Sequence, residues 1–260
     1  MPEGDTLART AAGLRPYLVG RTITAASASA PGPRAERLVG STVTAVEAAG
    51  KNLLIRFDNG LEVRTHLRMT GSWHRYRPGE AWRRPRSRAR LVLEVPGAVA
   101  VCFDAPTVEL FEQRSEALHP SLSQLGPDLL KDPFDAEEAI RRLRLPERAD
   151  VPIAVALLDQ RALAGIGNEV KNETLWVARR SPWTPVALVP DDELRRMIDI
   201  AREQLRIGAT TGRRPRHIYD TAGRPCPRCG TLIRVVEQAG DLPRLTYWCP
   251  TCQPDARNAG

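Results

Sequence analysis

The sequence contains very little lysine for a basic protein. Of its 38 basic residues only three are lysines, at Lys51, Lys131 and Lys171. Arginine supplies positive charge wherever a generic cation is enough, since it stays protonated and holds phosphate with a planar fork. A lysine is a compact amine whose pKa can be shifted. A lysine here therefore needs a specific reason, although chance suffices for Lys131 in an expected loop.

Long hydrophobic runs are also missing. No stretch of eighteen apolar residues occurs, and the start MPEGDT lacks the basic and apolar regions of a secretory signal. We therefore expect no membrane span and no export, and we place the protein in the cytoplasm.

The composition is that of a globular protein with a basic surface. The 260 residues are 42% hydrophobic, which is enough for one large or two modest domains with real cores. The net charge of +7 and the pI of about 9.6 favour a polyanionic partner. An acidic protein or a membrane surface would suit the same charge.

The hydrophobic pattern changes along the chain. Apolar residues at helical spacing predict an amphipathic helix over 5–18 that ends near Gly20. From 21 to about 113 the period is two, and the turns DNG and PG join pairs of strands, which predicts an antiparallel sandwich. After the Gly-Pro and Asp-Pro pairs of 125–134 the pattern predicts helices, at 135–145, 151–164, 168–179 and 191–207.

Four of the five cysteines have the spacing of a structural zinc site. Two Cys-x-x-Cys pairs, separated by nineteen residues, are formed by Cys226, Cys229, Cys249 and Cys252. Two disulfides are the alternative, which a cytoplasmic protein disfavours. We read Cys102, in an apolar strand, as a buried inert thiol. The four histidines, at His66, His74, His119 and His217, do not cluster and receive no metal role.

The segment AGIGN joins two helical patterns and carries Gly165 and Gly167, which can both take positive φ in a tight turn. A helix would then begin near Asn168. Its unpaired N–H groups and positive end would form a phosphate site. An ordinary helical hairpin with a glycine turn has the same local pattern.

Five motifs together resemble the formamidopyrimidine-DNA glycosylase and endonuclease VIII family. In order along the chain they are PEG, GKNLL, LGPDLL, LLDQRALAGIGNEVKNETLW and RLTYWCPTC. The resemblance implies an α+β multidomain fold, with a catalytic N-terminal helix and antiparallel β-sandwich (1–125), a linker (126–134), a helix-two-turns-helix domain (135–215) and a zinc ribbon (216–260). It also implies one structural Zn²⁺ and no organic cofactor.

The same resemblance implies an N-terminal nucleophile. Removal of Met1 would free the secondary amine of Pro2, which in such enzymes attacks the anomeric carbon of the damaged nucleotide, expels the base and leaves a Schiff base. A free α-amino group has a reference pKa of about 7.7–8, and the positive end of the following helix would disfavour its charged form further. Glu3 matches the family's acid/base residue. Lys51 matches a strand-borne lysine that reaches a phosphate and the lesion.

Four further positions match DNA-contacting residues of the family. Asn168 and Arg244 would pinch the phosphates of the flipped nucleotide, and Glu173 matches a family glutamate whose role could be architectural. In HLRMTGSW, Met69 is the candidate wedge for the emptied base position, with help from Arg68 or Leu67. A core methionine at a strand end is the alternative. The arginine and phenylalanine that the purine branch adds from a later loop are missing from DAPTVELF.

Two features favour the endonuclease VIII branch. The chain begins PEGD rather than the PELP of the purine branch, and the short path from helix 191–207 to Cys226 leaves little room for a loop that caps 8-oxoguanine. We therefore predict a bifunctional glycosylase and AP lyase for oxidised pyrimidines, acting by β,δ-elimination on double- or single-stranded damaged DNA, as a monomer that associates with the nucleoid. The Met69 loop resembles the purine branch more, so a formamidopyrimidine or 8-oxoguanine glycosylase is one alternative. A non-catalytic DNA-binding protein on the same scaffold is another.

Overall fold

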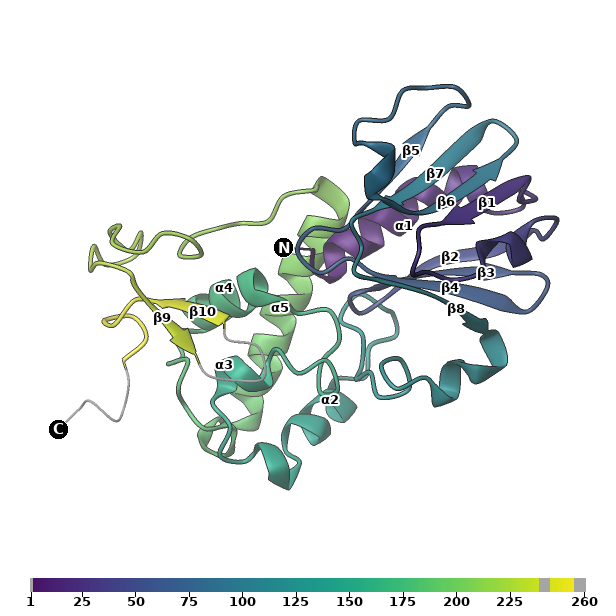
Figure 1. The fold of residues 1–260 in the computed structure, drawn as a ribbon. Helices are drawn as coiled ribbons and strands as arrows, with labels where there is room; N and C mark the ends of the chain where they lie inside the picture. Colours follow the sequence, from purple (N-terminus) through teal and green to yellow (C-terminus); the bar gives the residue numbers. More distant parts are fainter. Residues whose placement is uncertain (1, 239–243, 255–260) are drawn as a thin grey trace. The chain divides into compact units, whose positions relative to one another are not determined.

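The computed structural model describes residues 2–238 and 244–254 (Figure 1). The chain divides into two compact units, Met1–Ser123 and Gln124–Gly260, and each has its own hydrophobic core. Within the described ranges, no helix combines the length and the apolar character that crossing a bilayer requires.

The first unit is an antiparallel sandwich with one long helix. Its elements are α1 (Gly4–Leu18), β1 (Ala25–Ala28), β2 (Val43–Ala49), β3 (Asn52–Phe57), β4 (Leu61–His66), β5 (Ser72–Tyr76), β6 (Ala89–Val95), β7 (Ala98–Phe103) and β8 (Thr107–Glu112). One sheet has the order β1-β6-β7-β5 and the other β2-β3-β4-β8. All neighbouring strands run antiparallel, which confirms the predicted antiparallel sheets.

Apolar periodicity explains where α1 lies. Its buried face consists of Leu7, Ala11, Leu14 and Leu18, at the spacing that predicted the helix. This face joins one core with side chains of both sheets, such as Ile55 of β3 and Leu93 of β6. The helix ends just before Gly20, whose φ of +75° few other residues adopt.

The second unit is mainly helical in its described residues. Its elements are α2 (Ala136–Leu143), α3 (Ile153–Ala156), α4 (Asn168–Ala178), α5 (Asp191–Thr211) and a hairpin of β9 (Arg234–Gln238) and β10 (Arg244–Trp248). Short 3-10 helices occur in both units, at Ala35–Leu38, Arg86–Arg88, Gln113–Leu118, Pro146–Arg148 and Val186–Leu188. Helix α4 packs against both α5 and β10, so it joins the helical core to the hairpin.

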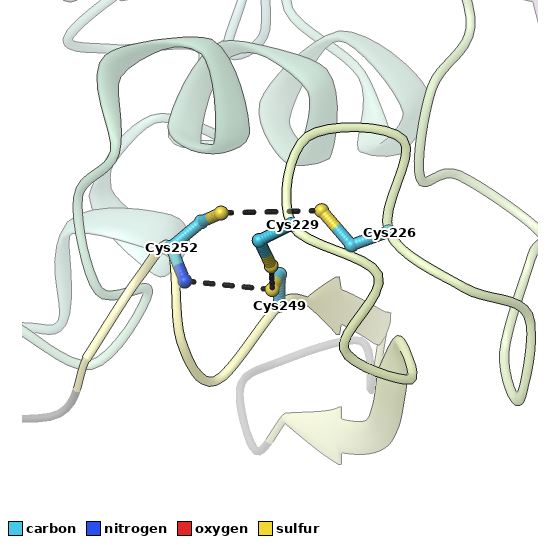
Figure 2. Close-up of side chains that lie close together, drawn as sticks. All are labelled: Cys226, Cys229, Cys249 and Cys252. Carbon is cyan, nitrogen blue, oxygen red and sulfur yellow. Dashed lines mark hydrogen bonds between the residues drawn. The ribbon is translucent and has the colours of Figure 1, made fainter.

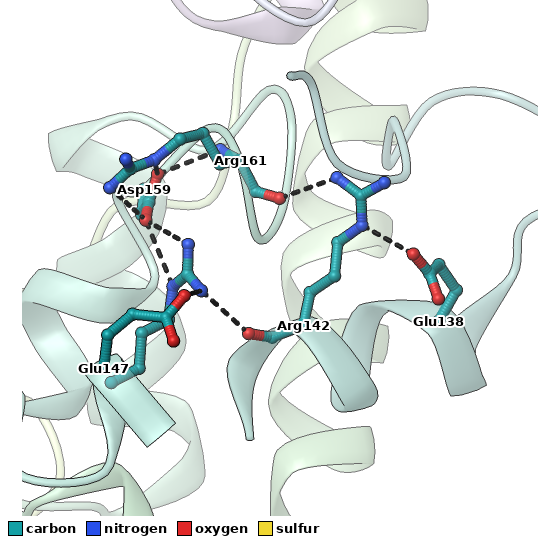
Figure 3. A network of polar contacts seen from close by, with 6 residues as sticks. Glu138, Arg142, Glu147, Asp159 and Arg161 are labelled. Atoms are coloured by element: carbon teal, nitrogen blue, oxygen red, sulfur yellow. Dashed lines mark hydrogen bonds and ion pairs between the residues drawn. The ribbon is translucent and has the colours of Figure 1, made fainter. Parts of the chain in front are cut away.

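The helix predicted over 151–164 is largely wrong, because α3 covers Ile153–Ala156 alone. Beyond it, the Asp159 carboxylate accepts the backbone N–H of Arg161 at 2.9 Å (Figure 3). The same carboxylate pairs with the Arg148 guanidinium at 2.7 Å. An aspartate that binds nearby backbone competes with helical hydrogen bonds. Ala164 then runs beside Asp128 in a parallel bridge. The apolar residues that follow α3 in this segment are therefore buried in a loop rather than on the face of a helix.

Candidate functional site

Helix α1 begins at Gly4, two residues after Pro2. Glu3 is the N-cap residue of α1, and its carbonyl accepts the N–H groups of Thr6 and Leu7 at 3.0 and 3.2 Å. Pro2 is half-buried, whereas Glu3 is 0% exposed. A carboxylate thus lies buried at the positive end of a helix, beside the proline.

Lys51 lies in the tight turn between β2 and β3, and α1 packs against both of these strands. The side chain of Asn52 braces the turn, since its Nδ2 donates to the carbonyl of Ala49 at 3.0 Å and its Oδ1 accepts from Arg64 at 2.9 Å. Lys51 itself is half-buried. The first unit therefore carries Pro2 and Glu3 at the start of α1, and Lys51 in the turn between two strands against which α1 packs.

His66, at the end of β4, is a neighbour of this turn that sequence reasoning missed. It pairs with Asn52 across the sheet. Burial, followed by the charges of Arg64, Lys51 and Arg68, lowers the pKa of His66 to about 4. The imidazole is therefore neutral at pH 7. The register of the predicted hairpin was the signal that could have placed His66 opposite Asn52.

The turn between β4 and β5 exposes Met69. The Met69 side chain is 63% exposed, so the alternative of a core methionine is wrong. Leu67 is 2% exposed and belongs to the core, so it does not help as a wedge. Arg68 has a φ of +46°, and the hydroxyl of Thr70 donates to the carbonyl of Asp104 at 3.1 Å. The hydrogen bond from Thr70 ties the turn that carries Met69 to the turn that follows β7.

In the second unit, a glycine turn leads into α4, as predicted. Gly165 has a φ of +107°, but Gly167 has a φ of −115° and is the N-cap of α4, so a positive φ there was wrong. Gln160 clasps the turn, because its Oε1 accepts from the Gly165 N–H at 3.0 Å and its Nε2 donates to the Ile166 carbonyl at 3.1 Å. Helix α4 begins at Asn168.

Side chains of α4 hold the hairpin strand β10, which Arg244 opens. Asn168 Nδ2 donates to the Leu245 carbonyl at 2.9 Å, and Lys171 Nζ donates to Thr246 Oγ1 at 2.8 Å. One helical turn after Asn168, the Oδ1 of Asn172 accepts the N–H of Tyr247 at 2.8 Å. The second unit thus brings Asn168 next to the strand that begins with Arg244.

Glu173 has a different environment from the other matched residues. It is 1% exposed, and its carboxylate accepts the backbone N–H groups of His217, Ile218 and Tyr219 at 2.9–3.0 Å. The same carboxylate pairs with His217 Nδ1 at 3.0 Å. These contacts order the loop after α5, and they agree with an architectural role rather than with DNA contact.

The four clustered cysteines converge at one point of the second unit (Figure 2). Their sulfur atoms all lie within 4.8 Å of one another, and none forms a disulfide. Zinc bound by four thiolates at about 2.3 Å would place neighbouring sulfurs about 3.8 Å apart. The Cys226–Cys252 and Cys229–Cys249 pairs lie at 3.9 and 3.4 Å. The donor set and spacing fit a closed tetrahedral zinc site. Cys102, by contrast, is 0% exposed, and burial raises the pKa of its thiol.

Three family models match successive parts of the chain. The formamidopyrimidine-DNA glycosylase N-terminal domain matches residues 1–108, the formamidopyrimidine-DNA glycosylase H2TH domain matches 125–216, and the zinc finger found in FPG and IleRS matches 223–254. A probable endonuclease 8 2 of Streptomyces coelicolor is 40% identical over 97% of this chain and 94% of its own length. The chain belongs to the formamidopyrimidine-DNA glycosylase and endonuclease VIII family.

Two further relatives bear on the activity and the fold. A DNA-(apurinic or apyrimidinic site) lyase Nei2 of Mycolicibacterium smegmatis is 37% identical over 97% of this chain and 99% of its own length. A Lactococcus lactis formamidopyrimidine-DNA glycosylase, solved with DNA that contains an AP site, has a TM-score of 0.83 and 22% identity, and the match covers 97% of this chain and all of that one. Because the sequence identity to this glycosylase is only 22%, the structural match supports the fold alone.

Proposed function

We propose that this chain removes oxidised pyrimidines from damaged DNA and cleaves the resulting abasic site by β,δ-elimination, through a Schiff base at Pro2. It is a bifunctional DNA glycosylase and AP lyase, in agreement with the names of its relatives, a probable endonuclease 8 and an AP lyase. The observation that carries the finer proposal is the start of α1, where Pro2 directly precedes a fully buried Glu3. A carboxylate that is buried at a helix N-terminus beside the proposed nucleophile fits a role in acid–base chemistry.

The proposed reaction begins once Met1 has been removed. The unprotonated amine of Pro2 attacks C1′ of the lesion nucleotide, the glycosidic bond breaks, and the base leaves with the bonding pair and a proton. The single hydrogen of the secondary amine supplies the proton that leaves with the base, and when the protonated ring oxygen breaks from C1′ the nitrogen lone pair forms the iminium. Glu3 would protonate the sugar ring oxygen and then carry protons during the two eliminations.

Lys51 and the residues of α4 and β10 have proposed roles in holding DNA. Lys51 would reach a phosphate and the lesion, beside the neutral imidazole of His66. The first N–H groups of α4, with Asn168, would meet one phosphate, and Arg244 would meet another. Met69, exposed on its turn, would fill the place of the extruded base. Double- and single-stranded DNA are both candidate substrates, and we expect a monomer.

One zinc ion per chain completes the proposal. Cys226, Cys229, Cys249 and Cys252 would hold it, and a closed four-thiolate site supplies structure rather than chemistry. Because β10 leads directly into Cys249, zinc would fix the strand that carries Arg244.

Base release from matched duplexes tests the pyrimidine assignment. We expect faster single-turnover release of thymine glycol and dihydrouracil than of 8-oxoguanine, since the path of Gly212–Pro225 is short for a loop that caps a purine. The sequence around Met69 resembles the purine branch, which makes that branch the second candidate. Faster release of 8-oxoguanine would establish that branch. Binding without release of any base would identify a non-catalytic damage-binding protein.

A further inference from the structure

The turn that carries Met69 is held at its next residue, Thr70, by two other segments of the first unit. The Thr70 hydroxyl donates to the carbonyl of Asp104, in the turn after β7, at 3.1 Å. The Thr70 carbonyl accepts from Nη1 of Arg84 at 3.3 Å. Arg84 lies in the connection between β5 and β6, residues 77–88. Two segments that follow later in the chain therefore hold the residue beside the exposed methionine.

Arg84 and Asp104 also bind each other, which closes the set of contacts around Thr70. The same Nη1 of Arg84 pairs with the Asp104 carboxylate at 2.5 Å, and Nε of Arg88 pairs with its other oxygen at 2.7 Å. The Asp104 side chain is only 15% exposed, so these bonds between charged groups are stronger than neutral ones and partly shielded from salt. In DAPTVELF, the segment that lacks the arginine and phenylalanine of the purine branch, Asp104 thus serves as an anchor.

The connection that carries Arg84 is itself fixed on the sheet. The ring centroid of Trp82 lies 6.0 Å from that of Tyr76 in a stacked arrangement and 5.7 Å from that of Phe103 in an edge-on arrangement. The backbone N–H of Arg83 donates to the hydroxyl of Tyr76 at 3.1 Å. Because Trp82 and Arg83 directly precede Arg84, the guanidinium reaches the Met69 turn from an anchored backbone.

Two residues of these turns have a backbone conformation that residues other than glycine seldom adopt. Arg68 has a φ of +46° and Asp104 has a φ of +51°. Such conformations persist where the surrounding structure holds them. Met69 lies between Arg68 and Thr70, so the direction of its side chain depends on both neighbours staying in place.

We propose that Arg84 is a positioning residue for base extrusion, because it holds the Met69 turn in the conformation that enters the DNA stack. The inference rests on the proposed role of Met69 as the wedge. A wedge on a loose turn would lose conformational freedom at the moment of insertion, whereas a turn that is fixed on folding has already lost it. Arg84 acts through Thr70 and Asp104 and takes no part in bond breaking.

A double substitution tests whether Arg84 acts through Met69. We expect Arg84→Gln to slow single-turnover base release from a lesion duplex by about tenfold, which is less than a misplaced reacting group costs. In a Met69→Ala background the same substitution should change the rate by less than about twofold, because the effects of residues that act as one unit are not additive. A full tenfold loss in both backgrounds would overturn the proposal.

Fluorescence measures insertion without chemistry. A 2-aminopurine next to the lesion brightens when it is unstacked, and we expect a smaller rise with Arg84→Gln than with the wild type. Arg83→Gln is the matched control and should give the full rise, since it removes the same charge from an exposed neighbour that has no ion pair within the described ranges. Equal rises for all three proteins would overturn the positioning role. An inactive wild type whose rise is reduced only by Arg84→Gln would contradict the glycosylase assignment and still support the positioning role.

Single-stranded DNA distinguishes positioning from general support of the fold. An abasic single strand has no base stack for a wedge to enter, so borohydride should trap Arg84→Gln on it as fast as the wild type. Equal losses of Arg84→Gln on the single strand and on the duplex would show that Arg84 supports the fold alone, and would overturn the proposal.

Discussion

The three lysines have different reasons to be lysine. Lys131 is exposed in a loop, as expected. Lys171 is 0% exposed and donates to Thr246 Oγ1, which in turn donates to Gln238 Oε1 at 2.8 Å. The five donors of a guanidinium would be hard to satisfy in that buried position. Lys51 is half-buried in a turn that its neighbours brace. The scarcity of lysine thus pointed to one structural amine and to one candidate for the chemistry.

We predict that Lys51→Arg lowers the rate of base release by about 100-fold, the scale of a misplaced reacting group, while DNA affinity changes little. Arginine retains the charge but replaces a compact amine with a larger planar group. Single-turnover rates and a binding titration on the same lesion duplex measure the two effects. Lys131→Arg is the control and should match the wild type in both. Equal rates for the two variants would remove Lys51 from the chemistry.

At the scale of elements, hydrophobic periodicity predicted the helices and hairpins whose formation depends on residues close together in the sequence. Helix α1 and the hairpins β3–β4 and β6–β7 formed as expected. The helix is specified by a regular apolar face, and each hairpin is specified by alternating apolar residues and a turn that contains glycine. The segment 151–164 did not form one helix, because Asp159 binds Arg148 and the backbone of Arg161. The apolar pattern of a buried loop resembles that of a helix, and its polar contacts depend on residues outside the window.

The contacts between α4 and β10 make a prediction about phosphate binding. We expect Arg244→Ala to weaken DNA binding and to reduce the slope of log affinity against log salt by about 0.9, the value for one phosphate contact. Titrations of one lesion duplex at several salt concentrations measure this slope. Arg114→Ala is the control, because the Arg114 side chain is 84% exposed on the first unit and pairs with Glu112. A slope for Arg244→Ala equal to that of the wild type would argue against a phosphate contact.

For the whole molecule, the order of the motifs indicated the family, the hydrophobic periodicity indicated the antiparallel sheets and the helical unit, and the cysteine spacing indicated the four-thiolate site. The sequence could not show what joins these parts within each unit. Glu173 receives three backbone N–H groups from residues more than forty positions later in the chain, and Trp176 stacks on the imidazole of His217 at 4.6 Å, also more than forty positions later. Such pairings depend on tertiary packing, which a local pattern does not encode.

The central claim is that the amine of Pro2 performs the chemistry. Borohydride reduction during reaction with a lesion-containing or abasic strand should trap a covalent complex, and mass spectrometry of its digest should locate the adduct on the peptide that begins at Pro2. A variant with an extended N-terminus is the control, and it should bind the same DNA without being trapped, because phosphate contacts supply most of the affinity. An adduct on Lys51, or trapping that persists in the extended variant, would contradict the account.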